Sequence, residues 1–502
     1  MKANKKTAGI GPMLNAYPDS IGGSLSHTVS LLGSPDLSDA FSSMYILPSL
    51  YNTDLDRGFS VQDYGINGEI ATEEDLAALR GMGISLKLDF ILNHLSVRSP
   101  QFRDLLQNGR DSEYRDFFID WNAFWDGYGE MTDDGYIQPY PEVIKDMFFR
   151  KPGLPLLMLP FPDGSKVPYW NTFYQEVIEK EDGSVDFLGQ MDLNIKSQKV
   201  WDHYEETLKK LSSYGAGIVR LDAFAYAPKE PGRRNFMNEP ETWDFLQQVQ
   251  DIADRFDLSL LPEIHAAYGE GVYKVLADKG YHVYDFFLPG LIIDALESGN
   301  AGRLKAWVDE IIESGIQTVN MLGCHDGIPM LDLKGLLPDE RIDELIEILK
   351  QRGGYVKDLH GKKNMYYQVN STYLSALGGD EDSLLLARAI QLFMPGKPQV
   401  WYLDLFAGSN DYEAVKKAGP GGHKEINRTN LTDSDVSAAL QKDVVRKQLE
   451  LLKLRNSHPA FTADADISVI ADGSRLIISW RSGEAEATLD ADLANLKYSL
   501  NM

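Results

Sequence analysis

The sequence predicts an α/β fold of the TIM-barrel class, a (β/α)8 barrel, on two observations. First, short apolar runs of strand length alternate with segments of helical period from residue 9 to residue 405, a pattern typical of βαβ units and a parallel sheet. Second, we count eight such runs, the number of strands that closes this barrel. A chain of 502 residues fits a barrel that carries insertions.

The eight runs are expected to be buried parallel strands, because such strands have apolar residues on both faces and appear as nearly continuous apolar segments. They are GIGPMLNAY (9–17), SMYILPSL (43–50), ISLKLDFILN (84–93), AGIVRLDAFA (216–225), LSLLPEIH (258–265), HVYDFFLP (282–289), QTVNMLGC (317–324) and PQVWYLDL (398–405).

Helical patterns separate these runs, and a glycine follows the last turn of three of them, where a left-handed cap is favoured. The clearest patterns are EEDLAALRGMG (73–83), KVWDHYEETLKKLSSYG (199–215) and RLKAWVDEIIESG (303–315), which end at Gly83, Gly215 and Gly315.

Two connections are too long to be simple crossovers, and both begin at the C-terminal face of the barrel, so they are expected to form lids or substrate walls. The tail alternates short strand-like runs with DGS and SGE turns, which predicts a small antiparallel β domain. The predicted domains are the barrel (1–93, 197–327 and 380–455), an inserted lid domain after strand three (94–196), an inserted domain after strand seven (328–379) and the C-terminal β domain (456–502).

The composition excludes several kinds of partner. The net charge of −26, from 75 acidic and 49 basic residues, argues against nucleic acid or an anionic membrane surface. No apolar run approaches the ~20 residues of a membrane span. The first twenty residues lack the apolar core of a signal peptide, so a cytoplasmic location is expected. Cys324, the single cysteine, is expected to be a buried spectator rather than a nucleophile.

Three carboxylates stand at the C-terminal tips of predicted strands: Asp222 in GIVRLDAFAY, Glu263 in LSLLPEIH and Asp326 in VNMLGCHDG. A barrel brings these strand ends into one pocket, although the residues are far apart in sequence. Cleavage of a glycosidic bond with retention requires a carboxylate nucleophile and a second carboxyl group that acts as acid and then as base. The three residues are therefore candidates for glycoside chemistry.

Each candidate also has a purely structural interpretation. Arg220 lies two positions before Asp222 on the same side of the strand, so it either keeps a nucleophile ionised or forms a buried ion pair with it. Glu263 is either an acid/base group among apolar neighbours or a solvated strand end. Asp326 would stabilise oxocarbenium charge and His325 would bind a sugar hydroxyl if the strand ends there.

The segments LDFILNHLS, with Asp89, Asn93 and His94, GIVRLDAFAY, PEIH and GCHDG resemble, in this order, the four signature regions of the α-amylase-type glycoside hydrolases. Further motifs resemble the sucrose-phosphorylase branch of that clan, and the resemblance runs from YPDSIGG to RNSHPAF, nearly the whole chain. These motifs are DRGFSVQDY (56–64), KPGLP (151–155), YQVNSTYLSALG (367–378), PGKPQVWYL (395–403) and EINR (425–428).

The resemblance implies a retaining double displacement with Asp222 as nucleophile, Glu263 as acid/base and Asp326 as transition-state stabiliser. It implies that the glucosyl unit is held by polar side chains against an apolar wall of Phe59 or Tyr226. The substrate-binding candidates are Asp56, Phe59, His94, Gln190, Arg220, Tyr226, His325, Met365, Tyr367, Gln368 and Lys424.

A phosphorylase uses inorganic phosphate in place of water as the second nucleophile and yields α-glucose 1-phosphate. The phosphate-binding candidates are Arg150, Lys151, Tyr367 and Lys424. We expect no cofactor and no metal, although Asn93 occupies a position near which amylase relatives often carry structural calcium. The expected partners are a small α-glucoside and phosphate, with the chain as a monomer or homodimer.

Two departures from the sucrose-phosphorylase pattern bear on the leaving group. Met365 replaces an Asp that contacts fructose, and Lys424 replaces an Arg, so directional partners for fructosyl hydroxyls are lost. We therefore expect phosphorolysis of 2-O-α-D-glucosylglycerol, with sucrose, sucrose 6'-phosphate or glucosylglycerate as alternative substrates. A further alternative is an α-glucoside hydrolase or transglucosidase. A degenerate barrel that only binds sugar or a partner is the non-enzymatic alternative.

Overall fold

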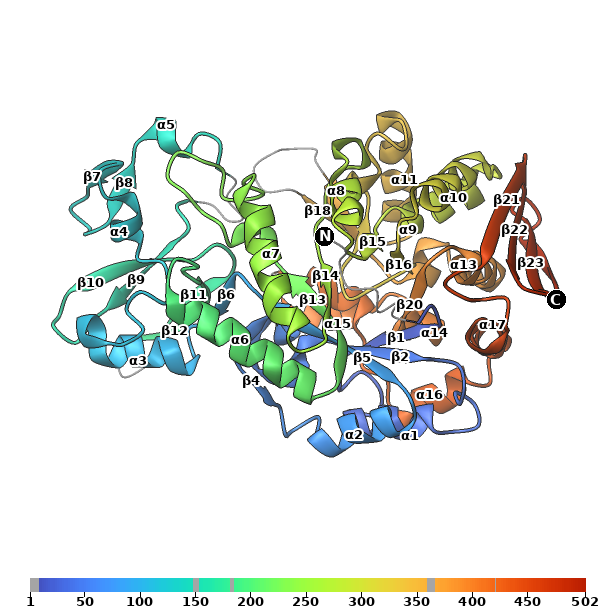
Figure 1. Cartoon of the computed structure of the whole chain (residues 1–502), viewed down its shortest axis with the longest axis horizontal. Coiled ribbons are helices and arrows are strands. Elements are labelled where there is room, and N and C mark those ends of the chain that lie inside the picture. The colour runs from blue at the N-terminus through green and yellow to red at the C-terminus, as the bar shows by residue number, and fades with distance from the viewer. Residues whose placement is uncertain (1–8, 148–152, 181–184, 359–365, 420) are drawn as a thin grey trace. The chain divides into compact units, whose positions relative to one another are not determined.

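The computed structural model describes residues 9–147, 153–180, 185–358, 366–419 and 421–502 (Figure 1). Eight strands join into one sheet, and each lies within one of the eight apolar runs or overlaps it closely. They are β1 (Met13–Ala16), β2 (Ser43–Ile46), β5 (Ser85–Ile91), β13 (Ala216–Asp222), β14 (Ser259–Pro262), β15 (Val283–Asp285), β16 (Thr318–Met321) and β20 (Lys397–Trp401).

The order of the strands in the sheet is that of a barrel. The sheet runs β14-β13-β5-β2-β1-β20-β16-β15, so consecutive barrel strands are neighbours from β1 to β14 and from β15 to β20, and the first strand also pairs with the last. Met13 of β1 stands opposite Ser43 of β2 on one side and Gln399 of β20 on the other, in parallel register on both. An open sheet built by consecutive crossovers would leave its first strand far from its last. The predicted (β/α)8 barrel is therefore confirmed.

The observed strands are shorter than the apolar runs, because several runs turn into helix at the C-terminal ends of the strands. Helix α14 (Tyr402–Leu405) takes up the end of the eighth run, and α9 (Leu288–Ser298) begins within the sixth. The fourth run continues into the 3₁₀ helix η4 (Phe224–Tyr226), with Ala223 between them at φ +52°. Apolar composition alone does not distinguish a buried strand from a buried helical turn.

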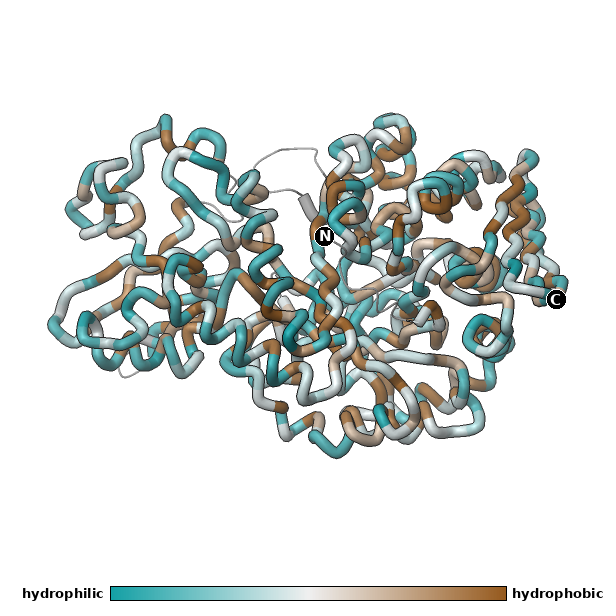
Figure 2. Tube along the Cα trace, in the orientation of Figure 1, coloured by the Kyte–Doolittle hydropathy of each residue, from teal (hydrophilic) through white to brown (hydrophobic). Residues whose placement is uncertain are grey.

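The predicted helices form as α2 (Glu73–Gly81), α6 (Gln198–Ser213) and α10 (Gly302–Ser314), and the three predicted cap glycines have φ between +63° and +90°. Helix α6 buries Val200, Tyr204, Leu208 and Leu211, spaced one turn apart, which is the stripe of an amphipathic helix. Brown and teal segments alternate along α6 in Figure 2 for this reason. The remaining helices that follow barrel strands are α1 (Leu25–Leu32), α7 (Glu241–Asp254), α8 (Val272–Asp278), α11 (Asp339–Gln351), α12 (Tyr373–Ala376), α13 (Glu381–Phe393), α15 (Tyr412–Ala418), α16 (Asp433–Ala439) and α17 (Asp443–Ser457).

The chain separates into two compact units, one made of Leu47–Glu69 and Leu88–Ile264 and the other of Met1–Ile46, Ile70–Lys87 and His265–Met502. The four domain boundaries drawn from the sequence remain a prediction. The first unit contains β3 (Tyr51–Leu55), β4 (Ser60–Ile66), β6 (His94–Ser96), β7 (Gly129–Met131), β8 (Ile137–Pro139), β9 (Leu156–Pro160), β10 (Lys166–Trp170), β11 (Gln175–Glu179), β12 (Val185–Asp192), α3 (Pro100–Asn108), α4 (Trp121–Trp125) and α5 (Pro141–Ile144).

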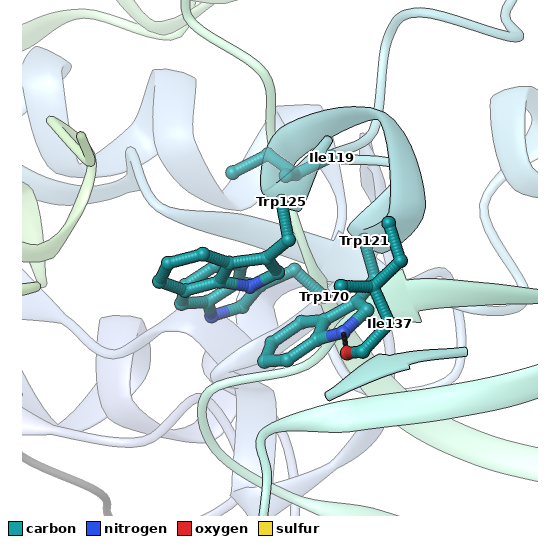
Figure 3. Packing of buried hydrophobic residues seen from close by; sticks show 5 residues of the cluster. All are labelled: Ile119, Trp121, Trp125, Ile137 and Trp170. Atoms are coloured by element: carbon teal, nitrogen blue, oxygen red, sulfur yellow. Dashed lines mark hydrogen bonds between the residues drawn. The ribbon is translucent and has the colours of Figure 1, made fainter. Parts of the chain in front are cut away.

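A tryptophan cluster holds the hairpins of this unit together (Figure 3). Trp125 stacks on Trp170 with ring centroids 6.1 Å apart, and Trp121 packs against the same ring at 4.8 Å. Trp121 Nε1 donates to the carbonyl oxygen of Ile137 at 2.8 Å, so its polar atom is satisfied although the side chain is buried. Large aromatic side chains thus give the residues after β5 their own core.

The chain ends in an antiparallel sheet of four strands, as predicted. It comprises β21 (Asp466–Asp472), β22 (Arg475–Ser482), β23 (Ala485–Asp492) and β24 (Lys497–Asn501). Buried residues alternate with less buried ones along β22, so one face of the strand packs on the protein. Within the described ranges, we find no helix that combines the length and the apolar character of a membrane span.

Candidate active site

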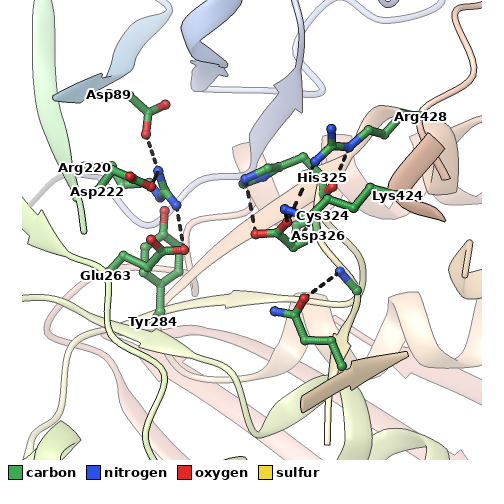
Figure 4. Close-up of polar contacts among 12 residues, drawn as sticks. Asp89, Arg220, Asp222, Glu263, Tyr284, Cys324, His325, Asp326, Lys424 and Arg428 are labelled. Atoms are coloured by element: carbon green, nitrogen blue, oxygen red, sulfur yellow. Dashed lines mark hydrogen bonds and ion pairs between the residues drawn. The ribbon is translucent and has the colours of Figure 1, made fainter. Parts of the chain in front are cut away.

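A buried arginine contacts three carboxyl groups from neighbouring strands: Asp89 within β5, Asp222 at the end of β13 and Glu263 directly after β14 (Figure 4). Arg220 Nη1 pairs with Asp89 Oδ1 and lies 3.1 Å from Asp222 Oδ1. Its Nη2 lies 2.5 Å from Glu263 Oε1. The guanidinium and Asp89 are buried, whereas the side chains of Asp222 and Glu263 keep 15% of their surface exposed. The two carboxylates predicted to react are the two that remain accessible.

The parallel pairing of β13 with β14 places these groups. Leu221 stands opposite Pro262, so Asp222, the last residue of β13, and Glu263, the first residue after β14, leave the sheet at the same level. Asp222 follows Arg220 by two positions, and their 3.1 Å contact shows that both side chains project from the same face, as alternation predicts. The surroundings of Glu263 differ from the expected apolar ones, because its carboxylate contacts the guanidinium directly.

The residues predicted to bind sugar in the same unit are close together and well packed. His94 Nε2 and Gln190 Nε2 each lie 2.9 Å from the carbonyl oxygen of Phe59. The Phe59 ring lies 5.4 Å from the guanidinium carbon of Arg220, so this ring is part of the arginine's surroundings. The sequence does not indicate a role for Phe173. Its ring centroid lies 5.1 Å from that of His94 and 5.1 Å from that of Tyr226.

A second cluster surrounds Asp326 in the other unit (Figure 4). Lys424 Nζ lies 2.6 Å from Asp326 Oδ1, His325 Nε2 lies 3.5 Å from Oδ2, and Arg428 Nη2 lies 3.8 Å from Oδ1. Burial raises the pKa of Asp326, but Lys424, and after it His325 and Arg428, outweigh burial and hold the pKa well below its usual range. Asp326 is therefore a carboxylate that stays ionised at acidic pH.

The backbone around Asp326 is fixed by side chains from the 3₁₀ helix η7 (Gly422–Asn427) and the residue after it. Asn427 Nδ2 donates to the carbonyl oxygens of Cys324 and Asp326, each at 3.0 Å. Arg428 Nε donates to the carbonyl oxygen of His325 at 2.8 Å. Asn427 and Arg428 belong to the EINR motif, for which the sequence alone indicates no role. The motif could have pointed to them, because Asn and Arg side chains each carry several N–H hydrogen-bond donors.

The strands after Asp326 provide further support. Strand β17 (Ile328–Pro329) pairs with β19 (Tyr366–Asn370), which pairs in turn with β18 (Tyr355–Asp358). Gln368 Oε1 of β19 accepts a hydrogen bond from the Gly327 amide at 3.3 Å. The predicted substrate residue Gln368 thus holds the turn next to Asp326.

Several predicted residues lie outside the described part of the chain. Arg150, Lys151 and Met365 are not described, and for Asp56 and Tyr367 only the backbone is. Their assignments therefore remain predictions.

Cys324 does not match its predicted place. It follows β16 rather than lying within it, and it is half-buried rather than buried, because the strand ends at Met321. Its Sγ accepts a hydrogen bond from the Asp326 amide at 3.4 Å, so the residue belongs to the turn that carries His325.

Among the residues that the structure describes, no cluster of three or more His, Cys, Asp or Glu side chains could hold a metal ion. Asn93, the position considered for calcium, accepts a hydrogen bond from Lys229 at 2.9 Å and donates one to Asp192 at 2.9 Å.

Replacing Lys424 with Met is expected to move the acidic limb of the pH–activity profile to higher pH by about one unit, because an adjacent opposite charge lowers a carboxyl pKa by roughly that much or more. The pKa of Asp326 is depressed, so its ionised form is lost as pH falls, and the variant loses it at a higher pH. The profile of kcat/KM from acidic to neutral pH measures the shift. Lys417→Met, at an exposed lysine of α15, is the control. An acidic limb at the parent position in Lys424→Met would contradict the role of this ion pair.

Comparison with known proteins gives consistent matches. The catalytic-domain model of alpha-amylase matches residues 40–274. The chain is 56% identical over 497 residues to a sucrose 6(F)-phosphate phosphorylase of Ilumatobacter coccineus, covering 97% of this chain and 95% of that one. It is 32% identical over 486 residues to a glucosylglycerol phosphorylase of Marinobacter adhaerens, covering 96% and 94%. The crystal structure of sucrose 6F-phosphate phosphorylase from Thermoanaerobacter thermosaccharolyticum matches with a TM-score of 0.89 at 34% identity, covering 99% and 96%.

Proposed function

The chain belongs to the sucrose-phosphorylase branch of the α-amylase-type glycoside hydrolases and is a phosphorylase of the glycosyltransferase type, and we propose that it transfers glucose from sucrose 6F-phosphate to inorganic phosphate. The choice of donor rests on one observation, the 56% identity to a protein named for that activity. Sequence reasoning favoured glucosylglycerol because of Met365 and Lys424. Identity to the glucosylglycerol phosphorylase is 32%, so the comparisons favour the alternative substrate instead.

In the first half of the proposed reaction, Asp222 attacks the anomeric carbon of the glucosyl residue. The bond from that carbon to the fructosyl oxygen breaks, and Glu263 gives its proton to this oxygen as fructose 6-phosphate leaves. In the second half, the Glu263 carboxylate takes the proton from the phosphate oxygen that attacks the anomeric carbon, and the ester bond to Asp222 breaks, so both carboxyl groups return to their starting states. Two inversions retain the α configuration and yield α-glucose 1-phosphate.

The contacts of Arg220 support this assignment of Asp222. The Arg220 guanidinium, 3.1 Å from Asp222 Oδ1, orients the side chain that the mechanism uses as nucleophile. The same guanidinium is fixed from behind by the buried Asp89, so it holds its position when the substrate arrives. We assign His94, Gln190, Phe59, Tyr226 and Asp56 to the glucosyl residue.

The cations around Asp326 support its assignment as a fixed negative charge. Because its pKa is well below the usual range, Asp326 stays ionised over the pH range in which an oxocarbenium-like transition state must be stabilised. Lys424 is the candidate to bind incoming phosphate among the described residues, and Arg150, Lys151 and Tyr367 remain sequence-based candidates.

A donor panel tests this function. The purified protein is incubated with sucrose 6F-phosphate, sucrose, 2-O-α-D-glucosylglycerol or glucosylglycerate, each with and without phosphate, and glucose 1-phosphate and glucose are quantified. We expect phosphate-dependent release of α-glucose 1-phosphate, with the highest kcat/KM for sucrose 6F-phosphate. A higher kcat/KM for glucosylglycerol would restore the first interpretation. Release of free glucose at the same rate without phosphate would make the protein a hydrolase.

A further inference from the structure

A buried lysine connects three segments of the unit that contains Asp222. Lys229 is only 4% exposed. Its Nζ lies 2.9 Å from Asn93 Oδ1, 2.5 Å from the carbonyl oxygen of Tyr226 and 2.8 Å from Asp192 Oδ2. An ammonium group has three N–H donors, so within the described residues each donor has an oxygen acceptor.

The carboxylate of Asp192 is as fully bonded as the ammonium. It is completely buried and accepts hydrogen bonds from the Thr172 amide at 2.7 Å, from Thr172 Oγ1 at 2.6 Å and from Asn93 Nδ2 at 2.9 Å. Burial lowers the pKa of Lys229, and Asp192 opposes that effect. Removing either partner would leave an uncompensated charge in the interior, so the two groups depend on each other.

An aromatic ring shields this ion pair from water. Nζ of Lys229 lies 5.7 Å from the ring centroid of Trp170, which is part of the tryptophan cluster in Figure 3. Trp170 Nε1 also donates to Thr172 Oγ1 at 3.1 Å, so the hairpin core and the ion pair share a residue. The lysine is therefore in a water-poor setting in which each hydrogen bond is directional and strong.

The three oxygens that bind the ammonium belong to segments that carry predicted glucose-binding residues. Asn93 directly precedes His94, Asp192 follows Gln190 by two positions on β12, and Tyr226 is itself a predicted sugar-binding residue. Phe173 packs against both His94 and Tyr226, and it directly follows Thr172, which donates a hydrogen bond to Asp192. If the ammonium group moved, the backbone at one or two residues from each of these sugar-binding side chains would move with it, and the side chains would be displaced.

We propose that Lys229 is a positioning residue for glucosyl transfer, a built-in cation that holds the His94, Gln190 and Tyr226 segments in their binding geometry. This inference rests on the proposed function, because that function gives the three residues their substrate. A purely structural ion pair would stabilise the fold without affecting turnover or sugar affinity of the folded protein.

The test is chemical rescue of Lys229→Ala. This change leaves a small cavity lined by three oxygens, which ammonium or methylammonium can fill with N–H donors. We expect kcat/KM to fall by about 100-fold, as expected when reacting groups are misplaced by about 1 Å. Methylammonium chloride is expected to restore most of that loss and to raise the thermal unfolding midpoint. Tetramethylammonium chloride at equal ionic strength has no N–H donor and should restore neither.

Two further variants keep the test decisive. Lys397→Ala removes another buried lysine, whose Nζ lies 2.5 and 3.0 Å from the carbonyl oxygens of Gly9 and Gly11, and its turnover should not respond to methylammonium. The double variant Lys229→Met, Asp192→Asn removes both charges, so it avoids the buried unpaired charge. We expect this double variant to fold but to bind glucose more weakly than the parent, because Met offers no N–H to Asn93 or Tyr226.

Glucose affinity, measured by titration calorimetry, separates this inference from the proposed function. If the parent protein binds glucose but does not use sucrose 6F-phosphate, the proposed donor fails, and the effect of Lys229→Ala on glucose affinity still decides the positioning role. Parent-like turnover and glucose affinity in folded Lys229→Ala would overturn the inference. Methylammonium that restores thermal stability without restoring kcat/KM or glucose affinity would overturn it as well.

Discussion

Asp222→Asn is expected to reduce kcat for phosphorolysis by about 10⁴-fold or more, the scale of loss seen when a catalytic nucleophile is removed. In the parent protein Arg220 Nη1 lies 3.1 Å from Asp222 Oδ1. The amide of Asn can occupy the same position, but it cannot form the glucosyl ester. Binding of glucose should change little, because the sugar-binding side chains are untouched. Steady-state kinetics and titration calorimetry on the same preparation measure the two quantities.

Asp89→Asn is the matched control for this prediction. Asp89 pairs with the same nitrogen of Arg220, but it is completely buried and cannot reach a substrate. Its loss should therefore destabilise the fold, by roughly the 3–5 kcal/mol of a broken buried pair, and should affect kcat much less than Asp222→Asn does. If Asp222→Asn kept parental turnover and lost only stability, the pair would be a structural ion pair and the proposed mechanism would be wrong.

The barrel could be predicted because its strands leave a local signal. Buried parallel strands are continuous apolar runs, so ISLKLDFILN and the seven other runs were each found without reference to the rest of the chain. The exact ends were not predictable in the same way. The eighth run contains both β20 and α14, and burial makes a strand and a helical turn equally apolar.

The sequence indicated the carboxyl groups that the proposed mechanism uses, but not the residues that support them. Asp222 and Glu263 stand at strand ends, where a barrel places reactive residues, so topology pointed to them. Their contact with a common guanidinium depends on the register of β13 against β14, which the sequence does not state. The sequence motif contains Asp89 but does not indicate its role, since its partner Arg220 is 131 residues away.

The same limit explains the supports that come from inserted segments. Asp192 lies at the end of β12, whose place is set by pairing with β6 in antiparallel register. Lys229 looks like an ordinary solvated lysine of a loop, and only the fold reveals that it is buried against Asp192. Long-range ion pairs have no sequence period, so the residues that fix a site are harder to predict than the residues that react.

Glu263→Gln is expected to separate acid catalysis from nucleophilic attack. The Gln side chain can keep the contact with Arg220 Nη2, which lies 2.5 Å from Glu263 Oε1, but it has no proton to give to a leaving oxygen. Turnover of the natural donor should fall by about 10²- to 10⁴-fold, the usual contribution of a general acid. Turnover of α-glucosyl fluoride should fall far less, because fluoride leaves without protonation while Asp222 still attacks.

The ratio of the turnover rates on the two donors identifies the acid, because a misfolded or displaced site would slow both reactions alike. Asp222→Asn provides the opposite pattern, since it should abolish the reaction of α-glucosyl fluoride as well as that of the natural donor. Azide, which needs no base, should accept the glucosyl group in Glu263→Gln and release α-glucosyl azide. Equal losses on both donors in Glu263→Gln would remove Glu263 as the acid and require another proton source for the departing sugar.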